Sequence, residues 1–332
     1  MTLPYFWRLL FLSAATFFVV NAICGLAARF FIPAVIRLTR RMQPRLAARL
    51  LLAVRLAPAT LATFAVLALC IPSYLSFEPG ATREEVGLAC VVATFLTTAL
   101  LTISFTRGIR ALVSTTSYAR TCIKSGSQIY ATTVTSPITV INGAAPIIAM
   151  VGVFRHRVIV SRGVLEILSP DELACALRHE GAHRTSSDNF KRLLLLLAPD
   201  ALPFAPRAFA ALDNAWITFA EWAADDSAVG NDQQRSLSLA AALVRVAQMG
   251  AAPRLSPLCT ALVPGNSACV NQDLSARVDR LLNAARLRPE APKRFRATMT
   301  AAVITMACAV FVALIRADTL HSVHRLLEVL TH

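Results

Sequence analysis

Two histidines four residues apart, His179 and His183, are the residues best suited to chemistry, and Glu180 directly follows the first. On an α-helix this spacing puts both imidazoles on one face, one turn apart, where they can share a tetrahedral Zn²⁺ ion. The carboxylate of Glu180 can then take a proton from an attacking water and return it to a leaving amine. The H-E-x-x-H pattern therefore predicts a hydrolytic zinc site. The alternative interpretation is a solvated helix that carries two histidines.

A third zinc ligand is expected from an E-x-x-x-D pattern that starts 38 residues after His183. Glu221 would complete a set of two histidines and one glutamate, which leaves the fourth coordination position for water or substrate. Asp225 lies one helical turn further along, where its carboxylate could accept the free N–H of a ligand imidazole, that of His179. The alternative is an ordinary solvated acidic turn that includes Asp226.

The start of the helix that must carry the motif is marked ten residues before His179. Ser169 and Glu172 have the spacing of a capping box, and Pro170 stands at the first helical position. Apolar residues follow at helical spacing: Leu173, Ala174, Ala176 and Leu177. We therefore predict that the H-E-x-x-H motif lies on a helix that begins at Pro170.

Three strand-like runs precede this helix, bounded by Pro137, Gly143 and Gly163. They cover residues 129–134, 138–141 and 157–160. Strands followed by helices predict an α+β domain with a small sheet. An extended substrate segment is expected to bind beside an edge strand within residues 147–160, by adding a strand to the sheet.

The rest of the chain has the composition of a membrane protein. Hydrophobic residues make up 56% and charged residues 16%, whereas soluble domains have about 45–50% and about 25%. A helix needs about 20 apolar residues to cross the hydrocarbon core. Four uncharged windows meet that length: residues 9–28, 56–77, 86–105 and 297–315. We expect four transmembrane helices.

The distribution of arginine and lysine predicts the orientation of these spans. Seven arginines and no acid lie between the first and second windows, and four basic residues without an acid follow the third. The connection after the second window holds three glutamates and one arginine. The expected arrangement is a membrane domain over residues 1–105, a cytosolic domain over 106–296, a fourth span and an extracytoplasmic tail over 316–332.

The net charge of +14 does not indicate a nucleic-acid-binding protein. The basic residues gather in segments between the spans, as membrane topology requires, and form no polybasic tract with interleaved aromatics. The eight cysteines include no C-x-x-C pair, so neither a thiolate zinc knuckle nor a disulfide framework is expected.

These motifs resemble those of the membrane-embedded zinc peptidases of the BlaR/MecR antirepressor type. Four spans with a peptidase domain between the third and fourth match that family's plan. The HtpX and CaaX-prenyl protease type is similar in its motifs but arranges its spans differently. The shared segments are Ile159-Val160-Ser161, residues 168–173, the H-E-x-x-H motif, Asp188-Asn189 and the E-x-x-x-D motif.

The resemblance implies an α-helical membrane protein with a cytosolic, gluzincin-like zinc endopeptidase domain in a bacterial cytoplasmic membrane. One Zn²⁺ would be bound by His179, His183 and Glu221, and Glu180 would be the base. Beta-lactam receptors of that family carry a penicillin-binding domain after the last span. Only residues 316–332 follow that span here, so direct antibiotic sensing is not expected.

Three functions remain open on the sequence alone. The protein could cleave a cytosolic regulator such as a transcriptional repressor, with a sensor partner or a second copy of the chain supplying the signal. It could degrade damaged membrane proteins. It could also be a zinc-stabilised signalling scaffold that binds a partner without cutting it.

A zinc peptidase also needs a group that stabilises negative charge on the scissile carbonyl oxygen. Arg277 is a candidate because it begins an amphipathic run similar to one late in these families. The other candidates are Asn271, His156 and Tyr130. The alternative interpretation of Arg277 is a surface arginine on a helix.

Overall fold

The computed structural model describes residues 4–77, 87–129, 138–202, 209–250, 255–263 and 270–284. The fourth expected span, residues 297–315, and the expected tail, residues 316–332, lie outside the described residues. The described part of the chain is mostly helical, with one small mixed sheet.

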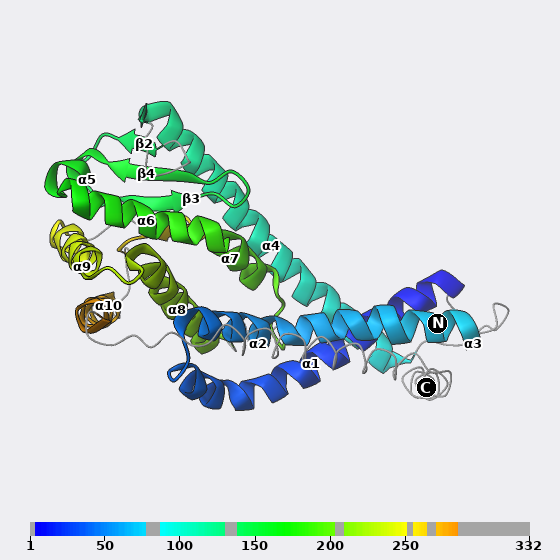
Figure 1. Ribbon diagram of the computed structural model, residues 1–332. Helices are drawn as coiled ribbons and strands as arrows, with labels where there is room; N and C mark the ends of the chain where they lie inside the picture. The colour runs from blue at the N-terminus through cyan, green and yellow to red at the C-terminus, as the bar shows by residue number, and fades with distance from the viewer. Residues whose placement is uncertain are drawn as a thin grey trace.

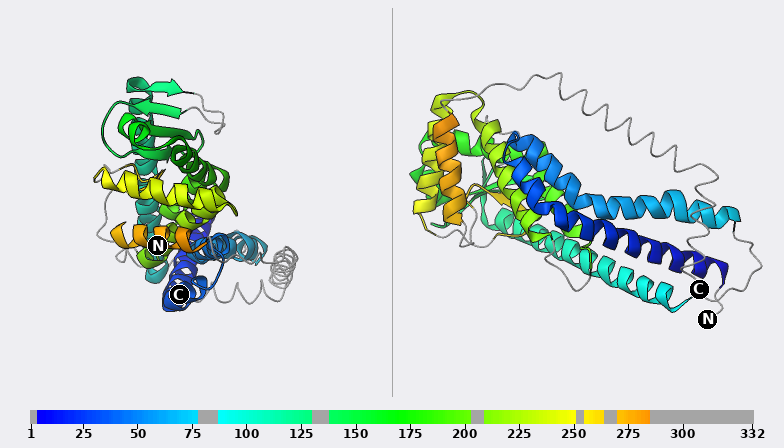
Figure 2. Two further views of the ribbon diagram at one scale, coloured as in Figure 1. Left: turned by 60° about the vertical axis from the view of Figure 1, so that its left-hand side comes forward. Right: turned by 90° about the horizontal axis from the view of Figure 1, so that it is seen from below.

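Three helical segments are long and apolar enough to cross a membrane. They are α1 (Tyr5–Thr39), the continuous segment formed by α2 (Pro44–Ala65), the π-helical turn η1 (Val66–Cys70) and α3 (Ile71–Phe77), and α4 (Leu88–Ser125). They extend side by side away from the sheet (Figures 1 and 2). These helices indicate a membrane protein. They contain the expected windows 9–28 and 56–77 and residues 88–105 of the third, whose first residue, 86, lies outside the described part.

All three segments are longer than the windows that predicted them. Helix α4 has 38 residues, about 57 Å at a rise of about 1.5 Å per residue, well beyond a hydrocarbon core of about 30 Å. It contains no proline, whereas α1 contains Pro33 and α2 contains Pro58. The domain boundary expected at residue 105 therefore lies inside α4, which continues without a break to the edge of the sheet (Figure 1).

The sheet has five strands in the order β1-β2-β4-β3-β5. Strands β2 and β4 are parallel, and the other neighbouring pairs are antiparallel. The expected strands 138–141 and 157–160 are confirmed. Of the first expected run, Ile129 is the last residue of β1, and residues 130–134 lie outside the described part. The bounds of the strands are β1 Ser127–Ile129, β2 Ile138–Ile141, β3 Ile148–Val151, β4 Arg157–Ser161 and β5 Cys259–Ala261.

The expectation of an edge strand within residues 147–160 is wrong. Strands β3 and β4 both have neighbours on both sides, because β5 pairs antiparallel with β3 in the register Met150↔Thr260. Strand β5 has only three residues and comes from about 100 positions further along the chain. Its pairing is therefore a tertiary contact that local patterning does not report.

Both faces of the inner strands β2, β3 and β4 are covered, which explains why these three strands are mostly apolar, whereas the edge strand β1 is exposed. Met150, Val158 and Val160 pack with residues of the helices on one face, including Ala176 and Leu243. Alternate residues, including Ala149, Val151 and Ile159, pack against the end of α4 on the other face. The remaining helices are α5 Arg162–Ile167, α6 Pro170–Ser186, α7 Asp188–Leu197, α8 Ala210–Val229, α9 Gln233–Gln248 and α10 Val270–Ala284.

An ion-pair network around the buried Arg55 and Asp200 joins the three long helices to the part of the chain that contains the sheet. Arg55 of α2 is 3% exposed and lies 3.4 Å from Asp200 and 3.1 Å from Asp213 of α8. Arg107 of α4 lies 3.0 Å from the other oxygen of Asp200. Asn21 of α1 donates a hydrogen bond to the main-chain carbonyl of Asp200 at 3.0 Å. The segment between α7 and α8 is therefore bonded to all three long helices.

We predict that Arg55→Ala lowers the free energy of unfolding by about 3 kcal/mol, because removing one partner leaves a buried carboxylate without full compensation. Arg49→Ala is the matched control. It changes an exposed arginine of the same helix, which has no partner among the described residues, and should shift the same quantity by less than about 0.5 kcal/mol. SDS titration of the full chain in mixed micelles measures both, and equal effects would contradict the prediction.

Candidate metal centre

Helix α6 begins where the sequence predicts. Ser169 is its N-cap, Pro170 is its first residue, and both hydrogen bonds of the capping box are present. The Ser169 N–H donates to Glu172 Oε2 at 2.9 Å, and the Glu172 N–H donates to Ser169 Oγ at 3.4 Å. This start fixes which face of α6 carries His179 and His183.

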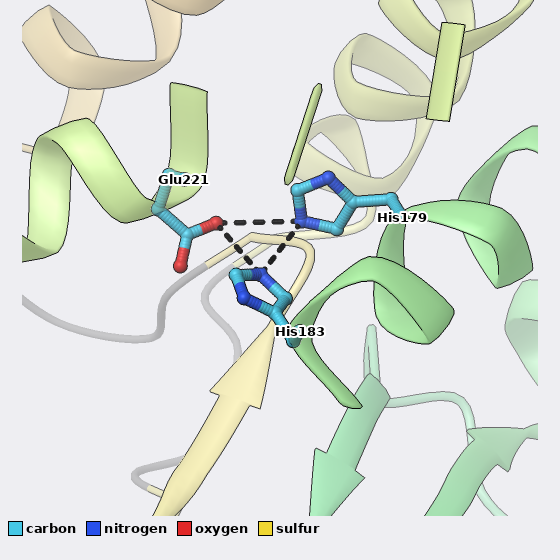
Figure 3. A group of neighbouring side chains, drawn as sticks. All are labelled: His179, His183 and Glu221. Carbon is cyan, nitrogen blue, oxygen red and sulfur yellow. Dashed lines mark hydrogen bonds and ion pairs between the residues drawn. The ribbon is translucent and has the colours of Figure 1, made fainter. Parts of the chain in front are cut away.

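Both imidazoles and one oxygen of Glu221 converge on one point from α6 and α8 (Figure 3). The two Nε2 atoms lie 3.1 Å apart. Glu221 Oε2 lies 3.4 Å from His179 Nε2 and 3.5 Å from His183 Nε2. Three ligands on a tetrahedral zinc, with bonds of about 2.0–2.1 Å, would be about 3.3 Å apart. The triangle therefore has the dimensions of one face of a zinc coordination tetrahedron.

The surroundings of this triangle also fit a cation. All three residues are buried, and Glu221 Oε2 is a buried carboxylate oxygen with no hydrogen-bond partner in the described part of the chain. Such an oxygen is costly unless a proton donor or a metal compensates it. His179, His183 and Glu221 together could hold a metal ion. The alternatives of a solvated histidine helix and a solvated acidic turn are wrong, since His179 and Asp225 are fully buried.

Each histidine has a carboxylate beside its other ring nitrogen. Asp225 Oδ1 lies 2.9 Å from His179 Nδ1, at the place expected for it. Asp188 Oδ2 lies 2.8 Å from His183 Nδ1. Asp188 is the first residue of α7, directly after the motif helix. These contacts hold the ring orientations and leave both Nε2 atoms for a metal.

Glu180 is held against the sheet on its own side of the site. The Met150 N–H of β3 donates to Glu180 Oε2 at 2.8 Å, and the Thr260 hydroxyl of β5 lies 3.5 Å from the same oxygen. The other oxygen, Oε1, is buried and has no hydrogen-bond partner among the described residues. One oxygen is thus fixed and the other is available to accept a proton. Sequence reasoning identified neither Met150 nor Thr260, because both contacts depend on the sheet.

Arg277 is part of this centre and not a surface residue, so that alternative interpretation is wrong. Its Nε and Nη2 groups donate to the two oxygens of Asp225 at 2.9 and 2.7 Å, and Nη1 donates to the Leu262 carbonyl at 2.8 Å. The side chain is 4% exposed. Nη1 also lies 3.5 Å from Glu221 Oε2. Arg277 thereby fixes the carboxylate that orients His179.

Of the other residues considered for carbonyl stabilisation, only His156 has a described side chain, and it makes no hydrogen bond or ion pair with the described residues of the site. His156 lies in the loop between β3 and β4, where its Nε2 is buried without a hydrogen-bond partner in the described structure. Tyr130 and the side chain of Asn271 lie outside the described residues. Gly181, inside the motif, does not serve a close packing contact, because a Cβ atom there would meet nothing within 4 Å.

The buried charges shift several pKa values. Burial raises the pKa of Glu180 to about 7, against the opposing effect of the two histidines. Burial alone would lower the pKa of His183, but Glu221 and Asp188 outweigh it and raise that pKa to about 10. Burial opposes ionisation of Asp225, yet Arg277 and His179 hold its pKa well below the usual range. Without a metal, the site therefore holds a proton among its histidines.

Comparison with models of known protein families and with curated proteins found no match to this chain. Interpretation of the site therefore rests on its own geometry and charges.

We predict that Asp188→Asn weakens zinc binding by about 10–100-fold, because His183 loses the charged acceptor that orients it. The matched control is Asp226→Asn. Asp226 adjoins Asp225 but pairs with Arg280 at 2.7 Å, on the surface side of α8. Competition between the protein and a fluorescent chelator measures the zinc affinity. An equal change in the two variants would show that Asp188 has no specific role.

Zinc affinity is also expected to increase with pH. A ligand imidazole must be neutral, and the pKa of His183 without metal is raised to about 10, so binding at lower pH displaces a proton. For one displaced proton, the apparent affinity rises about tenfold per pH unit. The same chelator competition from about pH 6 to about pH 8 tests this, after correction for the chelator's own protonation. A flat profile would mean that the imidazoles are already neutral.

Proposed function

We propose that this protein is an integral membrane zinc endopeptidase. The observation that carries the proposal is the triangle of His179, His183 and Glu221, beside which one oxygen of Glu180 is fixed and the other is unpartnered. A zinc ion in that triangle would supply Lewis-acid polarisation of the scissile carbonyl and lower the pKa of the attacking water. A binding site without catalysis gives no reason for the unpartnered oxygen of a buried carboxylate.

The protein groups would then act as follows. Glu180 Oε1 accepts a proton from the attacking water, and the water oxygen bonds to the carbonyl carbon. Glu180 afterwards donates the proton to the amide nitrogen as the C–N bond breaks. In the metal-free site, burial raises the pKa of Glu180 above its usual range, the direction that suits a group that must accept and then return a proton at neutral pH. The hydrogen bond from the Met150 N–H holds the carboxylate in place through both transfers.

The substrate is proposed to bind as an extended segment. Because β5 and not β3 is the outer strand beside Glu180 among the described strands, an incoming strand would pair with the outer edge of β5 or take the place of β5 on β3. Either mode satisfies the substrate's main-chain groups through the sheet and requires an unfolded stretch of substrate.

We further propose that the active site faces the cytosol, with the N-terminus outside. The seven arginines between the first and second apolar windows and the basic residues that follow the third window support this orientation. The network around Asp200 connects the three long helices to Asp213 of α8, the helix that carries Glu221. That connection favours signal-dependent cleavage of a regulatory protein, such as a repressor, over general degradation of membrane proteins.

Glu180→Gln is expected to lower peptidase activity by about 10²–10⁴-fold while the variant keeps its zinc, because the amide cannot accept the proton. The matched control is Asp171→Asn, an exposed acid at the start of the same helix. New protein N-termini are compared in cells that express wild type or each variant at equal levels. Loss of one cleavage in one DNA-binding protein would support regulation, and loss of many would support quality control. Identical N-termini in wild type and Glu180→Gln would contradict a peptidase.

A further inference from the structure

A second arginine reaches the metal-ligand carboxylate from the side opposite Arg277. Arg192 of α7 has its Nη2 atom 3.6 Å from Glu221 Oε1. Arg277 approaches the other oxygen, Oε2. The Nη1 group of Arg192 donates a hydrogen bond to the main-chain carbonyl of Cys259 in β5 at 3.3 Å. Arg192 therefore lies between a proposed zinc ligand and a peptide carbonyl.

Arg277 and Arg192 differ in how strongly their N–H groups are already hydrogen-bonded. Arg277 is 4% exposed and makes bonds of 2.7–2.9 Å to a carboxylate and a carbonyl. Arg192 is 18% exposed, its contacts are 3.3 and 3.6 Å long, and its Nε is buried with no hydrogen-bond partner in the described structure. A charged N–H donor that lies near the proposed zinc ligands and makes only long contacts can rotate to donate to a new acceptor. Arg192 meets these conditions and Arg277 does not.

The Cys259 carbonyl shows that a peptide carbonyl oxygen can accept a hydrogen bond from Arg192 beside the metal centre. Thr260, the next residue of β5, has its hydroxyl 3.5 Å from Glu180 Oε2. A peptide group can thus lie with its carbonyl oxygen on Arg192 while the adjoining residue reaches the proposed base. The scissile peptide group of a substrate needs the same two neighbours: a donor for its carbonyl oxygen and the proposed base, Glu180.

We propose that Arg192 is a catalytic residue that donates to the scissile carbonyl oxygen as it gains negative charge. This assignment rests on the proposed peptidase function. When the water oxygen bonds to the carbonyl carbon, the π-electron pair moves to the carbonyl oxygen and the water proton goes to Glu180. Arg192 stays protonated and only donates hydrogen bonds, which strengthen as the charge develops. When the C–N bond breaks, the carbonyl re-forms and Glu180 protonates the amine.

The test compares Arg192→Gln and Arg192→Lys with Arg235→Gln in the zinc-loaded full-length protein. Arg235 is an exposed residue of α9 that pairs only with Asp232 among the described residues. With unfolded β-casein as substrate, Arg192→Gln should lower kcat by about 10²–10³-fold. Its KM and zinc content should stay close to wild type. Arg192→Lys should recover part of the loss because it keeps a charged donor, and Arg235→Gln should be unaffected.

A binding measurement separates this role from a structural one. A peptidyl phosphoramidate carries a tetrahedral, negatively charged group in place of the scissile amide, and the matching peptide amide does not. Calorimetry should show Arg192→Gln binding the phosphoramidate more weakly by about the factor lost in kcat, with the amide unchanged. Equal weakening of both ligands, loss of zinc, or full kcat in Arg192→Gln would overturn the assignment. Equal casein cleavage by wild type and Glu180→Gln would instead overturn the proposed function.

Discussion

The arrangement of this fold depends on compensating several ionisable groups that are buried together. His179, His183, Glu180, Asp225 and Arg277 are all nearly inaccessible to solvent. Removing such groups from water costs several kcal/mol for each charge unless partners are held in suitable geometry. These groups and their partners come from several elements: α6, α8 and α10 supply the charges, and β3 supplies a main-chain donor. These elements must therefore pack in one arrangement, since a shift of any of them would leave a charge uncompensated.

The same requirement explains why the histidines are supported by carboxylates at both ends of the motif. Asp188 begins α7 and Asp225 lies within α8, so each ring is tied to a different neighbour of α6. Asn189, next to Asp188, donates to the main-chain carbonyls of Met150 and Gly152 at 3.2 and 2.9 Å. Helix α7 is thereby attached to β3, the strand that also fixes Glu180. Orientation of the proposed base and of the proposed ligands comes from one connected set of bonds.

The features that the sequence predicted correctly are those determined over a few residues. The capping box at Ser169, the spacing of His179 and His183 and two of the strands depend on near neighbours, and the structure has them as expected. The association of Glu221 with the histidines followed from chemistry, because three ligands of this kind suit one ion. The three long apolar helices followed from composition and length.

The features that were missed depend on contacts between distant segments. Strand β5 has three residues and no periodicity to detect, yet its presence makes β3 an interior strand. An amphipathic run around Arg277 does not show whether its polar face meets solvent or a buried carboxylate, and here it meets Asp225. Arg192 follows a lysine and precedes a run of leucines, which gives no sign that it reaches Glu221.

The unbroken course of α4 has a mechanical consequence. Near its far end, the Ser114 hydroxyl lies 3.0 Å from that of Ser256, which precedes β5, and Cys122 packs with the sheet. A helix of about 57 Å without a proline acts as a lever: a tilt of about 5° at one end displaces the other by about 5 Å. That displacement is comparable with the spacing of adjacent strands, about 4.8 Å. A small reorientation within a bilayer is thus large on the scale at which β5 meets β3.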